Sequence, residues 1–448
     1  MTKNKTGLGV LLLLAWSLLF SGRAEKETFA VFVKTFSGEY TQLNVPGIAY
    51  DYREYFNAIP GPAQLDAQQA FFEKKKTALN NFSRAQLKPV AQVTFDHLQY
   101  EIGFNLERIA LEKSWVAAGR KLPDDGLFAL ENRKAWYAYF IKKFTSLDYT
   151  PEEIMSFGLQ EVKRVQGEIN RIRMETGFTD SLAFVKHLVG EKFIITDKKK
   201  LQEIFARTDS AIRKNLAAFT GDANPPAVFP MEWPDAGANT PPGMYTNHEE
   251  NPYGKDVFLY NFFGGHYNSR AIEWLYMHEA IPGHHLQWSL RNDEQKDPLQ
   301  DLFLYPGNFE GWACYVEYYG KSLGVFRDPY SELGKWEWDL VRSARLVIET
   351  GIHYYGWTRE QALAYWKKNI PAQDDIAERE VTRVTNWPAQ AISYKIGADC
   401  LAKIKEETKK KYGNAFSEAR FNRAYLSFGM RPLDVVKNNF ENMYAAGK

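Results

Sequence analysis

The sequence has little cysteine. Only Cys314 and Cys400 occur in its 448 residues. This number excludes a disulfide-rich scaffold, and neither residue has the paired spacing of a structural zinc site. In an exported protein the two thiols can be oxidised to a bridge, but cysteines so far apart in sequence are as readily buried free thiols. Cysteine therefore does not define the fold.

The sequence also has no large excess of positive or negative charge. The formal net charge is +1, and no basic stretch is interleaved with aromatic residues. Without a positive field, a protein does not attract nucleic acid or an anionic membrane surface. The sequence shows no internal repeat and no low-complexity tract. We therefore expect no nucleic acid among the partners.

Long apolar runs are absent except near the N-terminus. Lys3 and Lys5 precede an apolar run at 8–20, and the small-residue stretch 21–24 follows it. This order is typical of a secretory signal peptide with cleavage after Ala24, and an uncleaved anchor helix is the alternative. No cysteine follows the run, so a bacterial lipid anchor is not indicated. No later stretch is long enough to span a bilayer. We expect an exported protein, periplasmic or extracellular after cleavage, without stable membrane insertion.

Aromatic residues and helical periodicity dominate the rest of the chain. Aromatic residues make up 15% of the sequence, which indicates a thick helical core or an aromatic-lined substrate groove. Apolar residues recur with a period near 3.6, and strands are scarce. Thr150 with Glu153, and Thr358 with Gln361, are capping boxes that predict helix starts. Further helices are predicted near 63–84, 90–118, 130–146, 198–219, 308–323, 332–354, 389–409 and 432–445. The fold class is therefore mainly α.

The segment 221–265 breaks the helical pattern. It is rich in proline and glycine and holds the β-prone run at 257–260. Long irregular segments are either linkers or loops that line a site. Because this one leads directly into a histidine-rich motif, we predict a small sheet or loop wall beside an active-site cleft. It separates an N-terminal helical lobe, 25–220, from a catalytic metal-binding lobe, 221–448, which could together form one continuous domain.

Three of the eight histidines lie within the segment 278–285. His278 at a helix end offers an imidazole ligand, and Glu279 places a carboxylate where it can take a proton from water on the same metal. This is the logic of the H-E-x-x-H zinc motif, in which the second histidine follows four positions after the first. Here that position is Pro282, which cannot ligate a metal. The candidates for the second ligand are therefore His284 and His285.

Pro282 and Gly283 affect the choice between the two histidines. In an unbroken helix His284 would lie about 240° around the axis from His278, whereas His285 would share its face about 10 Å further along. Proline disfavours helical geometry in the preceding residue, and glycine permits a turn. We therefore favour His284 as the second ligand. His285 remains a rival, and otherwise faces the substrate or a carboxylate near the metal.

A single catalytic metal also needs a third protein ligand and an open position for water. The best candidate is Glu310, because large aromatic residues surround it within 308–317. Glu317, two turns later on the same face, is its neighbour or its rival. Gly311 and Ala313 are expected to let this helix pack tightly against the helix of His278 and Glu279.

A third cluster lies at 380–397. Arg383 could pair with a substrate carboxylate or fix Glu380. Tyr394 could donate its phenol to a developing oxyanion. From spacing alone, a structural Arg–Glu pair and a core tyrosine are equally compatible with these residues.

These motifs resemble the bacterial family of proteins of unknown function numbered 885 (DUF885). The resemblance rests on HEAIPGHHLQ at 278–287, FEGWACYVE at 309–317, the stretch from Arg383 through PAQAISYKIG, and the segment YTPEEIMSFGLQEVKRVQGEI that begins at Tyr149. It covers roughly Tyr149 to Gly397. The family's members are exported or lipoprotein-like proteins that are grouped with the zincin-like metallopeptidases. The resemblance therefore implies a mostly helical zincin-like fold and peptidase activity.

The residues and the resemblance together predict a zinc-dependent hydrolase. His278, His284 and Glu310 are expected to hold Zn²⁺, Glu279 to act as the base, and Tyr394 to stabilise the oxyanion. The expected substrates are short peptides. The alternatives are a hydrolase of non-peptide amides, or an exported binding protein with a structural metal. Substrate identity, exo- or endo-cleavage and oligomeric state stay open.

Overall fold

The protein is described by a computed structural model that covers residues 28–123, 126–290, 298–371 and 373–446. It is mainly helical, which confirms the fold class expected from the periodicity. The signal peptide predicted at 1–24 lies outside the described residues. Within the described ranges, no helix is both long and apolar enough to cross a membrane.

The helix starts follow from local sequence signals. Both predicted capping boxes are formed, by Thr150 with Glu153 and by Thr358 with Gln361. Five of the helices begin with proline in the first turn, where the N–H that proline lacks would have no hydrogen-bond partner within the helix. The α-helices are α1 (Phe29–Thr41), α2 (Tyr52–Asn57), α3 (Pro62–Leu79), α4 (Pro89–Ala118), α5 (Arg133–Thr145), α6 (Pro151–Glu175), α7 (Ser181–Leu188), α8 (Lys198–Thr220), α9 (Ile272–Glu279), α10 (His284–Ser289), α11 (Pro306–Val316), α12 (Pro329–Thr350), α13 (Arg359–Asn369), α14 (Ala377–Asn386), α15 (Ser393–Tyr412), α16 (Glu418–Leu426) and α17 (Leu433–Ala446).

One predicted helix is shorter than expected. The prediction at 308–323 is wrong at its C-terminal end, because α11 stops at Val316 and a single 3-10 turn follows over Glu317–Tyr319. Gly320 then packs against the ring of Phe326, where a Cβ would lie 2.2 Å from a ring carbon. The chain therefore turns at this point, and Glu317 lies at the end of the helix.

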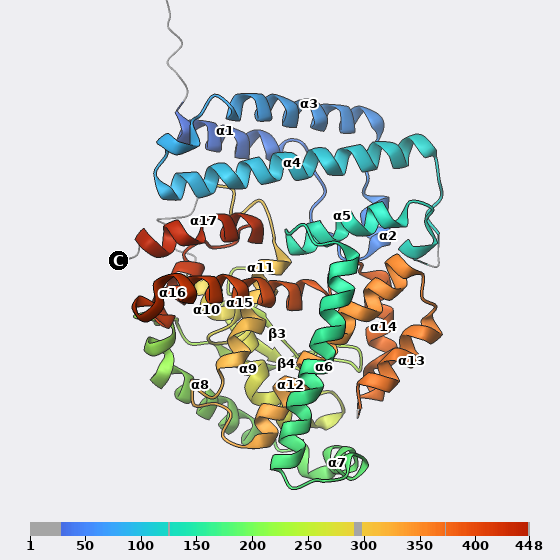
Figure 1. Ribbon diagram of the computed structural model, residues 1–448, viewed down its shortest axis with the longest axis vertical. Coiled ribbons are helices and arrows are strands. Elements are labelled where there is room, and N and C mark those ends of the chain that lie inside the picture. Colours follow the sequence, from blue (N-terminus) through green and yellow to red (C-terminus); the bar gives the residue numbers. More distant parts are fainter. Residues whose placement is uncertain (1–27, 124–125, 291–297, 372, 447–448) are drawn as a thin grey trace, which may run out of the picture.

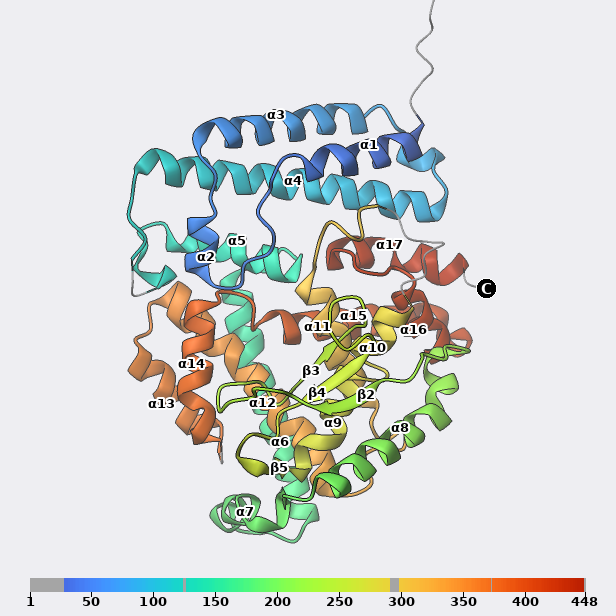
Figure 2. The same cartoon turned by 180° about the vertical axis from the view of Figure 1, so that it is seen from behind.

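The helices form an upper layer over a larger body (Figures 1 and 2). α1, α3 and α4 lie side by side as the upper layer and have an aromatic and aliphatic core of their own. In the body, α6 packs along α12, and α11 packs along α15. The main hydrophobic cluster extends in sequence from Tyr52 to Tyr444, so α2 and α5 share a core with the later helices. Cys314 and Cys400 are both buried free thiols.

α11 and α15 approach each other through glycine. A Cβ on Gly311 would lie 2.6 Å from the Cα of Gly397, and a Cβ on Gly397 would lie 2.0 Å from the carbonyl oxygen of Gly307. The expectation that Gly311 packs against the helix of His278 is therefore wrong: its open face meets α15. The backbones can touch here only because neither helix has a side chain at the crossing.

The segment 221–265 forms the small sheet that was predicted there. β2 (Phe229–Glu232) pairs in parallel with β4 (Val257–Tyr260), and β3 (Gly243–Thr246) pairs with β4 in the antiparallel sense. The central strand β4 is fully buried, and β3 is an edge strand that contacts α9. A separate short pair joins β1 (Ile194–Ile195) to β5 (Tyr267–Asn268). The sheet thus lies against the helix that carries His278 and Glu279 (Figure 2).

Candidate metal centre

The helix that carries His278 ends one residue later, and the chain folds back on itself. α9 ends at Glu279, the peptide bond of Ile281–Pro282 is cis, and α10 begins at His284. The backbone of Gly283 lies against the last turn of α9, where a Cβ would be 1.9 Å from the carbonyl oxygen of His278. Only glycine allows two backbones to come so close. The predicted helix break is therefore present, and it brings His284 beside His278.

Both histidines direct Nε2 at one oxygen of Glu310. Nε2 of His278 is 3.5 Å and Nε2 of His284 is 3.4 Å from Oε2 of Glu310. The two rings are nearly perpendicular, with centroids 4.8 Å apart. Phe309 stacks on His284 with a centroid separation of 3.7 Å. Nδ1 of His284 is buried and has no hydrogen-bond partner among the described residues, so the stacked phenyl ring holds the orientation of this imidazole.

The two separations from Glu310 are compatible with a shared zinc ion. Two ligand atoms that each lie about 2.1 Å from Zn²⁺ are about 3.4 Å apart when the angle between them is tetrahedral. The same separations are too long for good hydrogen bonds. Two imidazoles and a carboxylate are ligands that zinc prefers, and a set of three leaves the fourth position open, as in catalytic sites. The side chain of Glu310 is 16% exposed, so the group can be reached from solvent.

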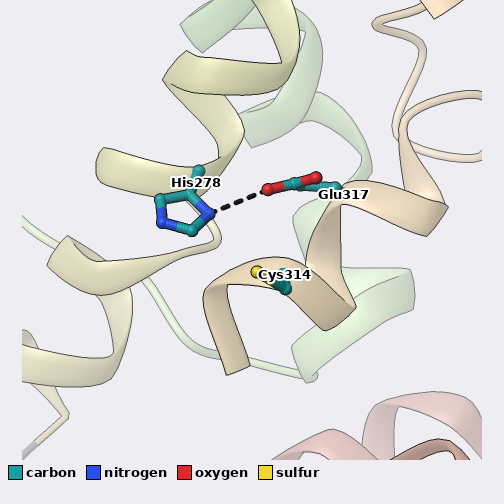
Figure 3. Close-up of side chains that lie close together, drawn as sticks. All are labelled: His278, Cys314 and Glu317. Carbon is teal, nitrogen blue, oxygen red and sulfur yellow. Dashed lines mark hydrogen bonds and ion pairs between the residues drawn. The ribbon is translucent and has the colours of Figure 1, made fainter. Parts of the chain in front are cut away.

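The opposite edge of the His278 ring contacts Glu317 and Cys314. Figure 3 shows one nitrogen of the ring facing Glu317, while the other points away from it. Nδ1 of His278 is 2.8 Å from Oε1 of Glu317, whose Oε2 accepts a hydrogen bond from Arg342 at 2.7 Å. His278, Cys314 and Glu317 offer a second set of ligand atoms, but the guanidinium already places a positive charge there. We interpret Glu317 as the carboxylate that orients His278 for a metal on its other side.

Glu279 lies beside the two histidines and is held by the sheet. Its Oε2 accepts a hydrogen bond of 2.8 Å from the backbone N–H of Tyr245, on edge strand β3. Ligand atoms of His278, Glu279 and His284 all lie within 4.8 Å of one another. Glu279 is 8% exposed. A carboxylate fixed beside the imidazoles by a backbone donor has the position that a general base requires.

The electrostatics of the group favour a bound cation. Burial lowers the pKa of His278, but its contacts with Cys314, Glu310 and Glu317 outweigh burial and raise the pKa well above its usual value. Burial raises the pKa of Glu310, but its contacts with His278 and His284 hold the pKa well below its usual range. Without a metal, the ionised carboxylates therefore keep a proton on His278. Metal binding to such a group displaces that proton.

Tyr394 and Arg383 lie on one side of this centre. The ring of Tyr394 on α15 is nearly parallel to His278, with centroids 6.4 Å apart. Burial raises the pKa of Tyr394, and the charge of Glu310 raises it further, so the phenol keeps its proton. Arg383 on α14 donates a hydrogen bond of 3.3 Å to the hydroxyl of Tyr394. The structure thus brings together six of the seven predicted site residues: His278, Glu279, His284, Glu310, Arg383 and Tyr394.

His285 is the residue that the structure places apart. Its Nε2 is 2.9 Å from the carbonyl oxygen of Pro226, its Nδ1 is 3.3 Å from the hydroxyl of Tyr245, and the carboxylate of Asp256 is 4.0 Å away. Burial lowers the pKa of His285, so the ring is neutral at physiological pH. In this position it links α10 to the segment 221–265.

Two residues near the centre were not singled out from the sequence. Tyr50, in the segment between α1 and α2, packs against Trp387 with centroids 5.7 Å apart. Burial and the charge of Glu310 raise the pKa of Tyr50 to about 12. Arg342 lies on α12 and holds Glu317. No motif surrounds Tyr50, whereas a charged residue within the apolar run of α12 was a usable signal for Arg342.

Comparisons with known proteins place the chain among bacterial proteins without an assigned activity. The profile of the family described as "Bacterial protein of unknown function (DUF885)" matches residues 119–439, well over half of the chain. No curated protein matches this chain.

Two solved structures share the fold. A candidate lipoprotein from Colwellia psychrerythraea is 23% identical, with a TM-score of 0.66, over 93% of this chain and 74% of that one. A candidate lipoprotein of unknown function from Shewanella oneidensis is 18% identical, with a TM-score of 0.69, over 92% and 99% of the two chains. At this level of identity, the similarity establishes the fold alone.

Proposed function

The chain belongs to the DUF885 family of bacterial proteins, and we propose that it is a zinc-dependent hydrolase of the zincin type that cleaves short peptides. The observation that carries the proposal is the convergence of His278 and His284 on Glu310, with separations of 3.4 and 3.5 Å. They match the spacing of ligand atoms around one tetrahedral zinc ion. Hydrogen bonding between these side chains does not by itself require that both histidines converge on one oxygen of Glu310.

Each residue of the group has a separate task. His278, His284 and Glu310 would hold the metal, and Glu317 would orient His278 through Nδ1. When bound, Zn²⁺ supplies a Lewis acid that polarises a carbonyl group and makes water more acidic. Glu279 accepts the proton of the attacking water and returns a proton to the leaving nitrogen.

Tyr394 is the donor for the developing negative charge. Its phenol keeps its proton because burial and Glu310 raise its pKa, so it can donate a hydrogen bond to the oxyanion. Preorganised donors of this kind account for a large part of the rate enhancement in acyl transfer. The centre is otherwise mostly buried, with His278 and His284 each 4% exposed. This burial favours short, flexible substrates over folded proteins.

We also propose that the protein acts after export. The N-terminal sequence has the order of charged, apolar and small residues typical of a signal peptide. The two solved structures named above are described as candidate lipoproteins. We therefore favour a periplasmic or extracellular protein.

Metal content and turnover together test the function. The purified protein should hold about one zinc per chain by elemental analysis, and it should cleave members of a library of short peptides. A chelator should abolish cleavage, and added Zn²⁺ should restore it. His284→Ala should lose both metal and activity, whereas the matched change of an exposed histidine, His266→Ala, should lose neither. Cleavage that survives complete removal of metal would contradict the proposal.

A further inference from the structure

Arg383 lies beside the candidate metal centre with unused hydrogen-bonding capacity. One of its Nη atoms donates to Oε1 of Gln390 at 2.8 Å and to the hydroxyl of Tyr394 at 3.3 Å. Its Nε is buried and has no hydrogen-bond partner within the described part of the chain. The guanidinium carbon of Arg383 lies 5.5 Å from the ring centroid of Trp387. A guanidinium has five N–H donors in a planar fork that matches a carboxylate.

The charge of Arg383 has no ion-pair partner among the described residues. Glu380, which the sequence suggested as a partner, pairs instead with Arg345 at 2.6 Å and with Arg379 at 3.2 Å. Burial raises the pKa of Glu349, another acidic group near Arg383, to about 8, so it is largely protonated at neutral pH. The charges of Glu380 and Glu310 act on Arg383 from a distance, but within the described residues neither carboxylate forms an ion pair with it. A half-buried guanidinium in this situation has lost hydration that a bound anion would replace.

The position of Arg383 relative to Tyr394 indicates what the anion is. The donor nitrogen of Arg383 and the hydroxyl of Tyr394 are 3.3 Å apart, and one extended residue spans about 3.3–3.6 Å. A carbonyl group held by Tyr394 and a carboxylate held by Arg383 therefore fit adjacent positions of one short chain. We propose that Arg383 binds the free C-terminal carboxylate of a peptide, so that the enzyme removes one residue from the C-terminus.

This inference rests on the proposed peptide hydrolysis and specifies which end of the substrate binds. One water is consumed and one amide C–N bond breaks. The water oxygen bonds to the carbonyl carbon, its proton passes to Glu279, and the leaving nitrogen receives a proton. The products are a peptide shortened by one residue and one free amino acid. The carboxylate on Arg383 does not react; it only positions the last peptide bond.

A pair of substrates that differ only at the C-terminus tests the proposal. Benzyloxycarbonyl-Gly-Phe and its C-terminal amide have the same scissile bond, but the amide lacks the negative charge. The free acid should have a kcat/KM roughly 10- to 100-fold higher, as expected for a hydrogen-bonded charged group that loses its partner. Equal turnover of both, with release of phenylalanine amide, would overturn the assignment of Arg383 and leave the proposed hydrolase intact.

Arg383→Gln identifies the residue responsible. It should lower kcat/KM for the free acid by the same roughly 10- to 100-fold, mainly through KM, and lower that for the amide far less, through the lost contact with Tyr394 alone. Arg379→Gln is the matched control, because it removes the same charge one turn earlier on α14 and should preserve the preference for the free acid. If Arg383→Gln weakens both substrates equally, the role of Arg383 is structural.

A binding measurement separates this inference from the proposed function. In the zinc-loaded Glu279→Gln variant, calorimetry should show tighter binding of the free acid than of the amide. Combining this variant with Arg383→Gln should remove the difference. Equal affinities for the two peptides would reject the carboxylate site, whether or not the parent protein turns over either peptide. A clear preference in binding, without turnover by the parent, would support the site and count against the hydrolase.

Discussion

Glu279 is held in place by the backbone N–H of Tyr245, whereas Glu310 and Glu317 are held by histidine and arginine side chains. This difference in contacts predicts a difference in function. Glu279→Gln should keep the metal and lower kcat by about 10²–10⁴-fold, because only the proton acceptor is lost. Elemental analysis and turnover measure the two effects separately. Glu250→Gln, an exposed change in the same region, should alter neither. Loss of metal from Glu279→Gln would make Glu279 a ligand instead.

Glu317 links the candidate metal centre to a buried arginine. Glu317→Gln should weaken zinc binding by about 10–100-fold, because the orienting partner of His278 loses its charge. It should also destabilise the protein by about 3–5 kcal/mol, because Arg342 is left buried without a counter-charge. Chelator competition and urea unfolding measure these two effects. The double variant Glu317→Gln/Arg342→Met should regain stability but not zinc affinity. If it regains both, Glu317 acts only through packing.

Glu349 should make the stability depend on pH. Burial raises its pKa from 4.5 to about 8 in the folded protein. Because the folded protein holds this proton more tightly than the unfolded chain does, protonation of Glu349 adds to the free energy of unfolding. This contribution is complete below pH 4.5 and falls by up to about 1.4 kcal/mol per pH unit as pH rises to 8. Glu349→Gln removes this contribution, so the variant should gain stability relative to the parent from pH 5 to pH 8. Urea unfolding at several pH values measures the gain, and exposed Glu407→Gln should show none.

At the scale of elements, the contact of α11 with α15 fixes the distance between Glu310 and Tyr394. Gly397→Ala would place a Cβ 2.0 Å from the carbonyl oxygen of Gly307, so the helices must separate. We expect a loss of about 1–3 kcal/mol in stability and weaker zinc binding. Gly167→Ala, where a Cβ on α6 meets nothing within 4 Å, should stabilise by about 0.5–1 kcal/mol instead. Thermal unfolding and zinc titration of both variants test this. Unchanged zinc affinity in Gly397→Ala would mean that the crossing of α11 and α15 does not control the geometry of the zinc site.

The sequence predicted those elements whose signals are local. Capping residues such as Thr150 act within one turn, so the start of α6 could be predicted without knowledge of the fold. The break between α9 and α10 was likewise predictable, because Pro282 and Gly283 restrict the backbone where they stand. The partner of Gly311 was not, because a small residue permits a close approach without specifying which helix makes it.

The candidate site shows the same distinction between local and distant contacts. His278 and His284 are six residues apart, and their convergence follows from one turn of backbone. Arg342 and Tyr50 reach the centre from distant parts of the chain, and their positions depend on how whole helices pack. The partners of Glu380 illustrate the limit, because spacing suggested Arg383 but the fold supplies Arg345 from α12.

At the scale of the whole molecule, the candidate metal group joins segments that are distant in the sequence. Its three proposed ligands come from α9, α10 and α11, and these helices pack in turn on the sheet, α15 and α12. The main hydrophobic cluster contains residues of all these helices. A metal that fixes the three ligands therefore restrains the core of the molecule, and opening the site requires part of that core to open. Metal binding and global stability should accordingly be linked.

This linkage gives a prediction that does not depend on any substrate. Zn²⁺ at 100 times its Kd should stabilise the folded state by about 2.7 kcal/mol and raise Tm, because the unfolded chain does not bring the three ligands together. A chelator should lower Tm to the same value that it has in His284→Ala without added metal. Glu279→Gln should keep the full zinc-dependent rise, since it removes the base and not a ligand. His266→Ala should behave like the parent. Differential scanning calorimetry with and without zinc measures all four proteins, and a full rise in His284→Ala would mean that zinc binds elsewhere.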